Sequence, residues 1–409
     1  MTQANDEPTR PRRRFRMRRK VLLACLASVL AFGVAEIALR LVGFSFPQPY
    51  FPDEHCGSRL VPGFRGWWSK EGAAQIQVNS FGFRDREHEL RKPQGTIRVA
   101  VLGDSYIEAF QVPQSAMFGS VLERELNAGA ADAGIEQSFE VLSFGVSGYS
   151  TAQELLALRH HVWQFEPDIV LLAFLPSNDI RGNSRELEPQ QVRPFIDIVD
   201  GQLVTDVSFR KHPAFLYAKK PSTMLKRDIV NASRVVQLIQ KVRYRDEESD
   251  AGKAAESAAE IGLDDHCFVE PTDSRWQSAW QVTEGLLEHF HREISERDCQ
   301  FAVAVVTAGL QVDPDPAVRR AYAKRLGVED LGYADRRIAE LGERGGFPTI
   351  LLSEPLGDFA ARTGRFVHGF PNTGPGQGHW NEDGHREAAL ACTAPLLQLV
   401  AEKSEPKPR

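Results

Sequence analysis

The chain has 409 residues, of which 42% are hydrophobic and 25% are charged, a composition that is typical of globular proteins and excludes a wholly disordered chain. Its net charge of −6 is uneven, because residues 1–20 hold eight Lys or Arg and only two acidic residues, so the rest of the chain carries −12. An acidic body of this kind argues against binding to nucleic acid.

The first predicted element is a membrane-spanning helix over residues 21–44. The basic tail 1–20 runs directly into this segment, which is apolar except for Glu36 and Arg40. At about 1.5 Å per residue the segment is long enough to cross a bilayer. Glu36 and Arg40 are four residues apart, so they can pair on a helix. We therefore predict a transmembrane signal-anchor that attaches the protein to a membrane.

The positive-inside rule places the basic tail in the cytoplasm and exports everything after the anchor. We therefore expect a single-pass protein of the inner membrane whose body lies on the periplasmic side. A cleaved signal peptide is the alternative, because Gly33 and Ala35 suit a small-residue cleavage site.

The anchor is followed by a predicted stalk and entry segment, residues 45–93, called the stalk segment below. The Pro and Gly content of residues 46–75 indicates that this part is extended. Residues 94–402 form the predicted main domain, with an insertion at about 185–275. Within this insertion the charged stretch 243–260 is either a solvated helix or disordered, and residues 403–409 form a frayed tail. The five cysteines lack the close spacing of zinc or redox sites, so we expect no metal and no cofactor, and the disulfide connectivity cannot be deduced.

Strand and helix patterns alternate through the main domain. Strands are predicted at 98–102, 139–144, 168–174, 301–307 and 348–353. Helices are predicted at 118–127, 152–163, 333–343 and 384–401. The strands are nearly continuous apolar runs, which is typical of strands that are covered on both faces. This alternation predicts an α/β fold with a central parallel sheet flanked by helices.

Polar residues follow the first three predicted strands. Gly103-Asp104-Ser105 follows the first strand, Gly148 lies just after the second, and Ser177-Asn178-Asp179 follows the third. The carboxyl ends of parallel strands meet at one edge of the sheet, so these groups are expected to converge there. Near the C-terminus, His379 adds an imidazole that can accept a proton from a serine hydroxyl.

This set resembles the SGNH/GDSL hydrolase family, and the stretch 79–84 is similar to membrane-anchored bacterial members. The resemblance implies a flavodoxin-like three-layer sandwich, the SGNH hydrolase fold. It also implies that Ser105 is the nucleophile and His379 the base, and that the oxyanion hole is formed by the Ser105 N–H, the Gly148 N–H and the Asn178 side chain.

The sequence departs from the family pattern just before His379. An acidic residue usually precedes that histidine by two or three positions, whereas this chain has Gln377 there. Gln377 is one candidate to orient the imidazole through its amide oxygen, as is a backbone carbonyl, and Asp358 or Asp383 is a candidate to replace the missing carboxylate from elsewhere.

The leading functional hypothesis is a membrane-tethered, extracytoplasmic serine esterase that hydrolyses small acyl esters, O-acetyl above all, on an acylated glycan. A second hypothesis is an acyltransferase similar to alginate acetyltransferases, which would use the same serine and histidine. A third is a glycan-binding pseudoenzyme that has lost its acidic residue.

Overall fold

A computed structural model describes residues 12–247 and 264–404 of the chain. Parts of three predicted segments therefore lie outside the described residues: most of the basic tail, the centre of the charged insertion and the end of the C-terminal tail.

The core of the protein is a five-stranded parallel sheet. Its strands, in spatial order, are β6 (Ser138–Gly145), β5 (Thr96–Gly103), β7 (Ile169–Phe174), β10 (Gln300–Val305) and β11 (Thr349–Leu351). Numbered along the chain, this order is 2-1-3-4-5, which is the flavodoxin-like arrangement. The five predicted strands and the predicted fold class are therefore confirmed.

Helices cover both faces of the sheet, because the strand residues alternate between two apolar layers. Val99 and Val101 of β5 pack on one side, and Ala100 and Leu102 pack on the other. The first layer is completed by α3 (Phe118–Gly129), α13 (Ser353–Thr363) and α14 (Glu382–Ser404). The second is completed by α4 (Thr151–Ala157), α10 (Ser274–Ser295) and α12 (Tyr333–Gly345). The result is the expected three-layer sandwich.

The stalk segment is folded rather than extended. It forms two antiparallel hairpins, made of β1 (Tyr50–Asp53) with β2 (Gly57–Leu60) and of β3 (Arg65–Trp68) with β4 (Ala74–Gln77). Leu60, Ile76 and Val78 are buried in a small core together with Phe110 of the main domain. The hairpins pack on the body through this small core. The Pro and Gly residues that suggested a stalk lie in the turns and along the edges of the hairpins.

The insertion also contains regular structure. It includes a hairpin of β8 (Phe195–Val199) and β9 (Gln202–Asp206), followed by α6 (Pro213–Ala218), α7 (Pro221–Ala232) and α8 (Arg234–Glu247). Farther along the chain, η6 (Gly309–Val312) and α11 (Pro316–Leu326) follow β10. Many residues of these helices are exposed, so the hydrophobic periodicity of this part of the sequence is weak.

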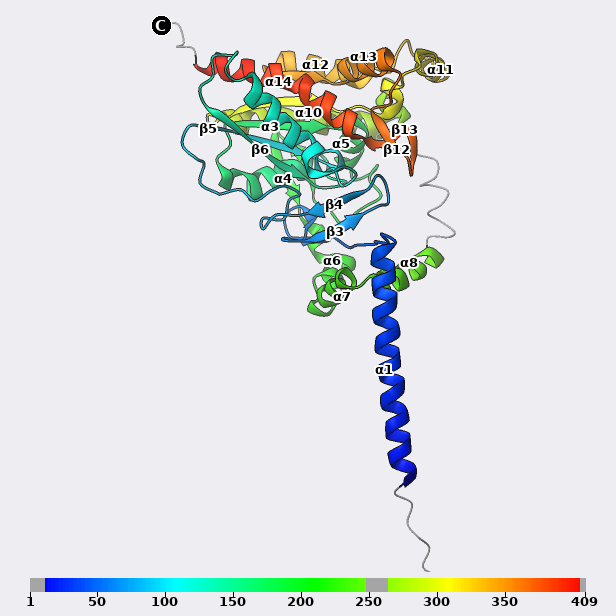
Figure 1. Ribbon diagram of the computed structural model, residues 1–409. Coiled ribbons are helices and arrows are strands. Elements are labelled where there is room, and N and C mark those ends of the chain that lie inside the picture. Colours follow the sequence, from blue (N-terminus) through cyan, green and yellow to red (C-terminus); the bar gives the residue numbers. More distant parts are fainter. Residues whose placement is uncertain (1–11, 248–263, 405–409) are drawn as a thin grey trace, which may run out of the picture.

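Helix α1 (Arg12–Leu41) extends away from the body (Figure 1). Its segment Met17–Leu41 has a mean hydropathy of 2.3 over its most apolar stretch, none of which is buried in the protein. By length and composition α1 is able to cross a membrane, and a signal sequence would meet the same criteria.

Candidate active site

Ser105 lies at the carboxyl end of β5, at the start of the short helix α2 (Ser105–Glu108). Asp104 caps this helix by accepting the Tyr106 N–H at 3.0 Å, which fixes the turn that carries the serine. Only 7% of Ser105 is exposed. Its Oγ is 2.7 Å from Nε2 of His379, so the structure brings together the two residues that the sequence singles out.

His379 is carried by β13 (Gly374–Trp380), which pairs with β12 (His368–Phe370) just before α14 begins. The Tyr106 ring packs against the imidazole with their centroids 5.1 Å apart, and Trp380 next to it is fully buried. The histidine itself is 6% exposed. These contacts fix the ring with one nitrogen facing the serine.

The other imidazole nitrogen faces Glu71, a residue that the sequence analysis missed. Oε2 of Glu71 is 2.5 Å from Nδ1 of His379, and Oε1 accepts the backbone N–H of His379 at 2.7 Å. Glu71 lies in the loop between β3 and β4, within the stalk segment. The carboxylate that was expected just before the histidine is therefore supplied from 308 residues upstream.

The three residues proposed to take this place do not occupy it. Gln377 is exposed, and the Nδ1 atom of His379 is bonded to Glu71 instead. Asp383 pairs with Arg386 at 2.8 Å and with Arg365. Asp358 lies on α13, and no bond joins it to His379 among the described residues. The role first given to Gln377 is therefore corrected in favour of Glu71.

The electrostatics of the pair favour a charged carboxylate. Burial alone would raise the pKa of Glu71, but the hydrogen bonds and the attraction from His379 outweigh it and lower this pKa below its ordinary value. An ionised Glu71 accepts a hydrogen bond from the Nδ1–H group of His379, so the ring proton stays on Nδ1 and the unprotonated Nε2 faces the serine hydroxyl. The site thus holds the tautomer that a general base requires.

The loop that carries Glu71 is fixed by close backbone packing. Asn372, in the turn between β12 and β13, accepts the Gly72 N–H at 2.9 Å and donates to the Gly72 carbonyl at 3.0 Å. Gly378 has a φ of +83°, and a Cβ there would lie 2.1 Å from Oε1 of Glu71. Only glycine leaves room for the carboxylate at this position. No local motif marks Glu71, because its partner is distant in sequence.

The expected oxyanion groups gather at the carboxyl ends of β5, β6 and β7. Gly148 is exposed in the turn after β6 with a φ of +76°. Asn178 lies on α5 (Pro176–Gly182), after β7, and donates to Oδ2 of Asp104 at 2.6 Å, which leaves its second amide hydrogen. Within the described residues, the N–H groups of Ser105 and Gly148 have no hydrogen-bond acceptor. These donors are therefore available to a ligand.

A buried carboxyl group supports the loop that holds Gly148. Glu108, at the end of α2, accepts the Ser147 N–H at 3.2 Å and the Tyr50 hydroxyl at 2.9 Å, and it also accepts the Ser147 hydroxyl. Burial raises the pKa of Glu108 to about 7. The helix that begins with the serine is thus tied at its other end to the turn beside Gly148.

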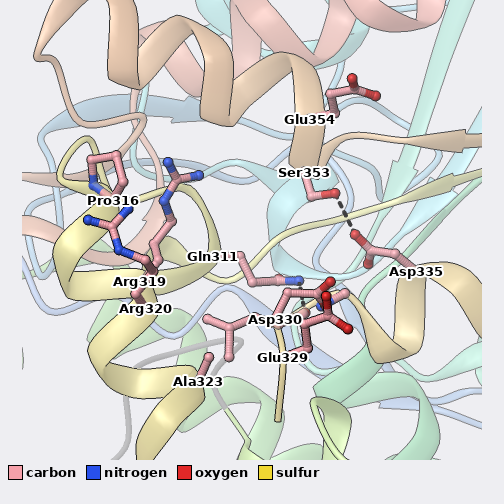
Figure 2. A pocket seen from close by; sticks show the side chains of 12 residues that line it. Gln311, Pro316, Arg319, Arg320, Ala323, Glu329, Asp330, Asp335, Ser353 and Glu354 are labelled. Atoms are coloured by element: carbon pink, nitrogen blue, oxygen red, sulfur yellow. Dashed lines mark hydrogen bonds between the residues drawn. The ribbon is translucent and has the colours of Figure 1, made fainter.

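A separate cavity of about 370 Å³ lies between η6, α11, α12 and α13 (Figure 2). Arg319 lies on one side of it and Asp330 on the other, and Ser353 donates to Asp335 at 2.5 Å. Among the described residues that line this cavity there is no histidine to activate Ser353. The cavity is distinct from the group formed by Ser105, His379 and Glu71.

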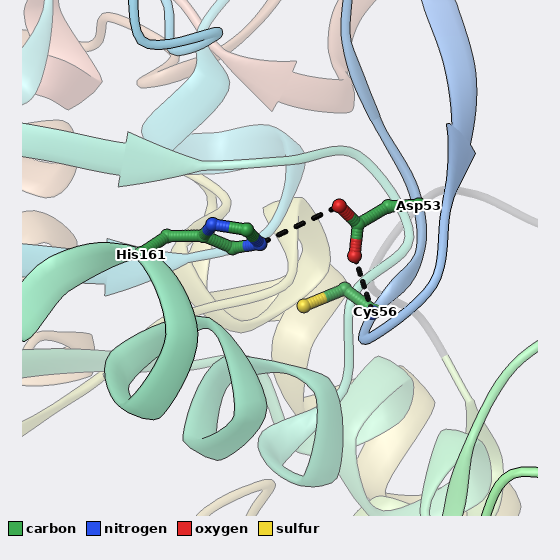
Figure 3. A group of neighbouring side chains, drawn as sticks. All are labelled: Asp53, Cys56 and His161. Atoms are coloured by element: carbon green, nitrogen blue, oxygen red, sulfur yellow. Dashed lines mark hydrogen bonds and ion pairs between the residues drawn. The ribbon is translucent and has the colours of Figure 1, made fainter.

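Asp53, Cys56 and His161 form a further cluster, with ligand atoms that lie within 4.8 Å of one another (Figure 3). Arg59 approaches this cluster, since its Nη1 is 2.8 Å from Nδ1 of His161 and its Nε is 3.9 Å from Asp53. Burial also raises the pKa of the Cys56 thiol, which disfavours the thiolate that a metal would need. A positive guanidinium and a neutral thiol make these residues a packing contact between β1–β2 and the helical layer.

The comparisons with known proteins are limited to structural likeness, because no known protein family and no curated protein matches the sequence. The acetyl xylan esterase AlAXEase is 11% identical, with 73% of this chain and 100% of that chain covered at a TM-score of 0.36. A lipase/acylhydrolase from Enterococcus faecalis is 14% identical, with 76% and 100% covered at a TM-score of 0.34. An acetylxylan esterase from Geobacillus stearothermophilus is 10% identical, with 73% and 93% covered at a TM-score of 0.36. Likeness at this level does not assign an activity.

Proposed function

We propose that this protein is a membrane-tethered serine esterase of the SGNH/GDSL type, with Ser105 as nucleophile, His379 as base and Glu71 as the acidic member. The observation that carries the proposal is the unbroken chain of hydrogen bonds from the Ser105 hydroxyl through the imidazole to the Glu71 carboxylate. A serine hydroxyl is a weak nucleophile until an oriented base accepts its proton, and this chain supplies such a base.

The reaction follows from the positions of these groups. As Ser105 Oγ attacks the ester carbonyl carbon, Nε2 of His379 takes the hydroxyl proton and the imidazolium is stabilised by Glu71. The former carbonyl oxygen gains a negative charge and accepts hydrogen bonds from the N–H groups of Ser105 and Gly148 and from the amide of Asn178. His379 then gives its proton to the leaving alcohol, which departs and leaves an acyl-serine. Water next attacks the acyl carbon while Nε2 of His379 takes a proton from it, and His379 returns this proton to Ser105 Oγ as the bond to the acid breaks.

The substrate and location follow from the anchor and from the family resemblance. Helix α1, with its basic tail on the cytoplasmic side, would hold the body on the periplasmic side of the inner membrane. Acylated glycans are esters accessible there, and a small acyl group such as O-acetyl is the class that the resemblance implies. Acyl transfer to a sugar hydroxyl would use the same residues and differ only in the acceptor.

The pseudoenzyme hypothesis loses its support in this structure. It rested on the absence of an acidic residue beside His379, and Glu71 occupies that position with a 2.5 Å contact. A serine, a histidine and a carboxylate joined in this order match the geometry of a serine triad.

The test is hydrolysis of aryl acetates by the full-length protein in detergent micelles. We expect turnover by the wild type and its loss in Ser105→Ala and His379→Ala, together with labelling of the wild type but not of Ser105→Ala by a phosphonate probe. Ser353→Ala, which changes the serine of the separate cavity, is the matched control and should keep its activity. Unchanged turnover in Ser105→Ala would contradict the assignment. A second reaction with an added polysaccharide acceptor distinguishes acyl transfer, which forms a new ester, from hydrolysis, which releases the free acid.

A further inference from the structure

The helices α6, α7 and α8 expose an unusual amount of apolar surface. Outside α1, fourteen large apolar side chains of the described residues are exposed, and seven of them lie between residues 216 and 242. Leu225 and Ile229 share one face of α7, and Leu238, Ile239 and Val242 share one face of α8, with exposures from 37% to 62%. Two more lie on α6. Clusters of this kind mark an interaction surface.

These helices lie on the side of the body from which α1 leaves, with α7 and α8 beside its upper end (Figure 1). The contact is specific. Glu36 of α1 accepts the Ser233 hydroxyl at 2.9 Å and the backbone N–H groups of Arg234 and Val235 at 3.0 and 3.1 Å. It therefore caps the first turn of α8, where a carboxylate is favourable. Arg40 pairs with Glu36 at 2.7 Å and donates to the Ala232 carbonyl at 3.0 Å.

The chain that follows α1 is bound to the same helices. Gln237, which is fully buried, accepts the Phe46 N–H at 2.8 Å. Asn231 exchanges two hydrogen bonds with the backbone of Gln48, at 2.8 and 2.9 Å. The corner between α7 and α8 is therefore held at a fixed height beside the end of α1.

The length of the apolar stretch puts this corner at the surface of the bilayer. The uninterrupted apolar residues 21–35 span about 22 Å, while a hydrocarbon core is about 30 Å thick. About five further residues are needed, which brings Glu36 and Arg40 to the outer boundary of that core. Charges at such a depth must be paired, and the cap on α8 and the ion pair supply the partners.

The charge of this region fits a lipid surface. Residues 210–243 contain nine Lys or Arg and one acidic residue, whereas the chain beyond residue 20 carries −12 in total. Basic side chains around an exposed apolar face are the pattern of helices that lie in a membrane interface and contact anionic headgroups.

We propose that α6, α7 and α8 form a membrane platform, whose apolar side chains enter the boundary of the bilayer that α1 crosses and whose basic side chains contact anionic headgroups. The platform fixes the orientation of the body, and so of Ser105, above the membrane. This proposal rests on the anchor role of α1 within the proposed function, and it does not depend on the esterase activity.

The test places a polarity-sensitive fluorophore on the full chain, reconstituted in vesicles of phosphatidylcholine and phosphatidylglycerol. The fluorophore is attached to Ile239→Cys in a Cys25→Ala background, because the other native cysteines are buried. Leu225→Cys gives a second position on the platform. Leu390→Cys on α14 is the matched control, since Leu390 is 44% exposed and Ile239 is 51% exposed. The native Cys25, labelled in the unchanged chain, reports insertion of α1.

We expect the labels at positions 239 and 225 to shift their emission to the blue and to be quenched by lipids with a nitroxide near the headgroup. The label at position 390 should behave as in water. If the Cys25 label is quenched by lipid while the platform labels match the control, α1 is a membrane anchor but the platform proposal is wrong. A surface that binds another protein instead of lipid would give this result. If the Cys25 label is not quenched, the anchor fails and the platform fails with it.

Discussion

At the scale of single residues, the most informative contact is that of Glu71 with His379. The 2.5 Å contact from a buried carboxylate both orients the imidazole and offsets the charge it gains during proton transfer. A backbone carbonyl or a glutamine would orient the ring but stabilise that charge less. The contact therefore decides whether Ser105 works as a member of a pair or of a triad.

We predict that Glu71→Gln lowers kcat on aryl acetates by about 10³- to 10⁴-fold, because a neutral amide at Nδ1 permits the wrong tautomer of His379. Steady-state kinetics measure the effect, and circular dichroism establishes that the variant is folded. Gln377→Ala is the control at the position where the family carries its acidic residue, and it should retain the wild-type kcat. The reverse pattern, with Gln377→Ala inactive and Glu71→Gln active, would contradict the assignment.

At the scale of elements, the site depends on two hairpins that meet over α2. The β3–β4 loop brings Glu71 and the β12–β13 hairpin brings His379. The Asn372 side chain joins the two by hydrogen bonds to the Gly72 backbone. The closest approach is at Gly378, where a side chain would overlap the carboxylate. The two hairpins can approach this closely because Gly378 has no Cβ atom.

We predict that Gly378→Ala displaces Glu71 and lowers kcat about as much as Glu71→Gln does. Gly374→Ala is a matched control, because Gly374 also has a positive φ, +110°, but a Cβ there meets no atom within 4 Å. Both variants should lose about 1 to 3 kcal/mol of stability from backbone strain, and only Gly378→Ala should lose activity. Thermal unfolding and kinetics on the same samples separate the two effects, and equal activities would exclude the proposed overlap.

Helix α2 makes the stability of the protein depend on pH, because it ends at the buried carboxyl group of Glu108. The pKa of this carboxyl is raised from 4.5 to about 7 by burial, so the folded state holds the proton more tightly than the unfolded state does. The stability that Glu108 contributes is therefore complete below about pH 4.5 and is lost as the pH rises through about 7.

We predict that Glu108→Gln reduces the fall in unfolding free energy between about pH 5 and about pH 8, by up to about 3 kcal/mol, since glutamine does not titrate. Denaturant titrations of the full chain at both pH values measure the difference. Glu136→Gln, which alters an exposed carboxyl group, serves as the control. A slope that is the same in Glu108→Gln and in the wild type would show that other buried acids cause it.

The sequence was sufficient for elements whose pattern is local. The five core strands are nearly continuous apolar runs, and Ser105 and Asn178 follow two of them directly, so their positions at one edge of the sheet were predictable. The pairing of Glu71 with His379 joins positions that are 308 residues apart, and no periodicity or spacing encodes it. The hairpins of the stalk segment were missed because Pro and Gly indicate turns without indicating what packs between them.

At the scale of the whole molecule, the fold is held without covalent cross-links. All five cysteines are free thiols, and Cys56, Cys267, Cys299 and Cys392 are buried apart from one another. Two extensive apolar layers on the central sheet provide the stability instead.

We predict that dithiothreitol does not change the thermal midpoint of the full chain. Loss of a structural disulfide would cost about 2 to 5 kcal/mol, which calorimetry would detect as a clear drop in the midpoint. A chain with Cys25 blocked by alkylation controls for cross-linking between molecules through the exposed thiol of α1. A lower midpoint in the reduced sample would show that two of the buried cysteines are paired.

Glu71 precedes the strands of the central sheet in the sequence, which limits the segments of this protein that can be transferred to another chain together with a complete site. A recombination event that moved only residues 94–402 would transfer the serine and the histidine but leave the carboxylate behind. The triad that we propose thus joins the segment next to the membrane to the α/β body, and a transfer that keeps all three residues must include both.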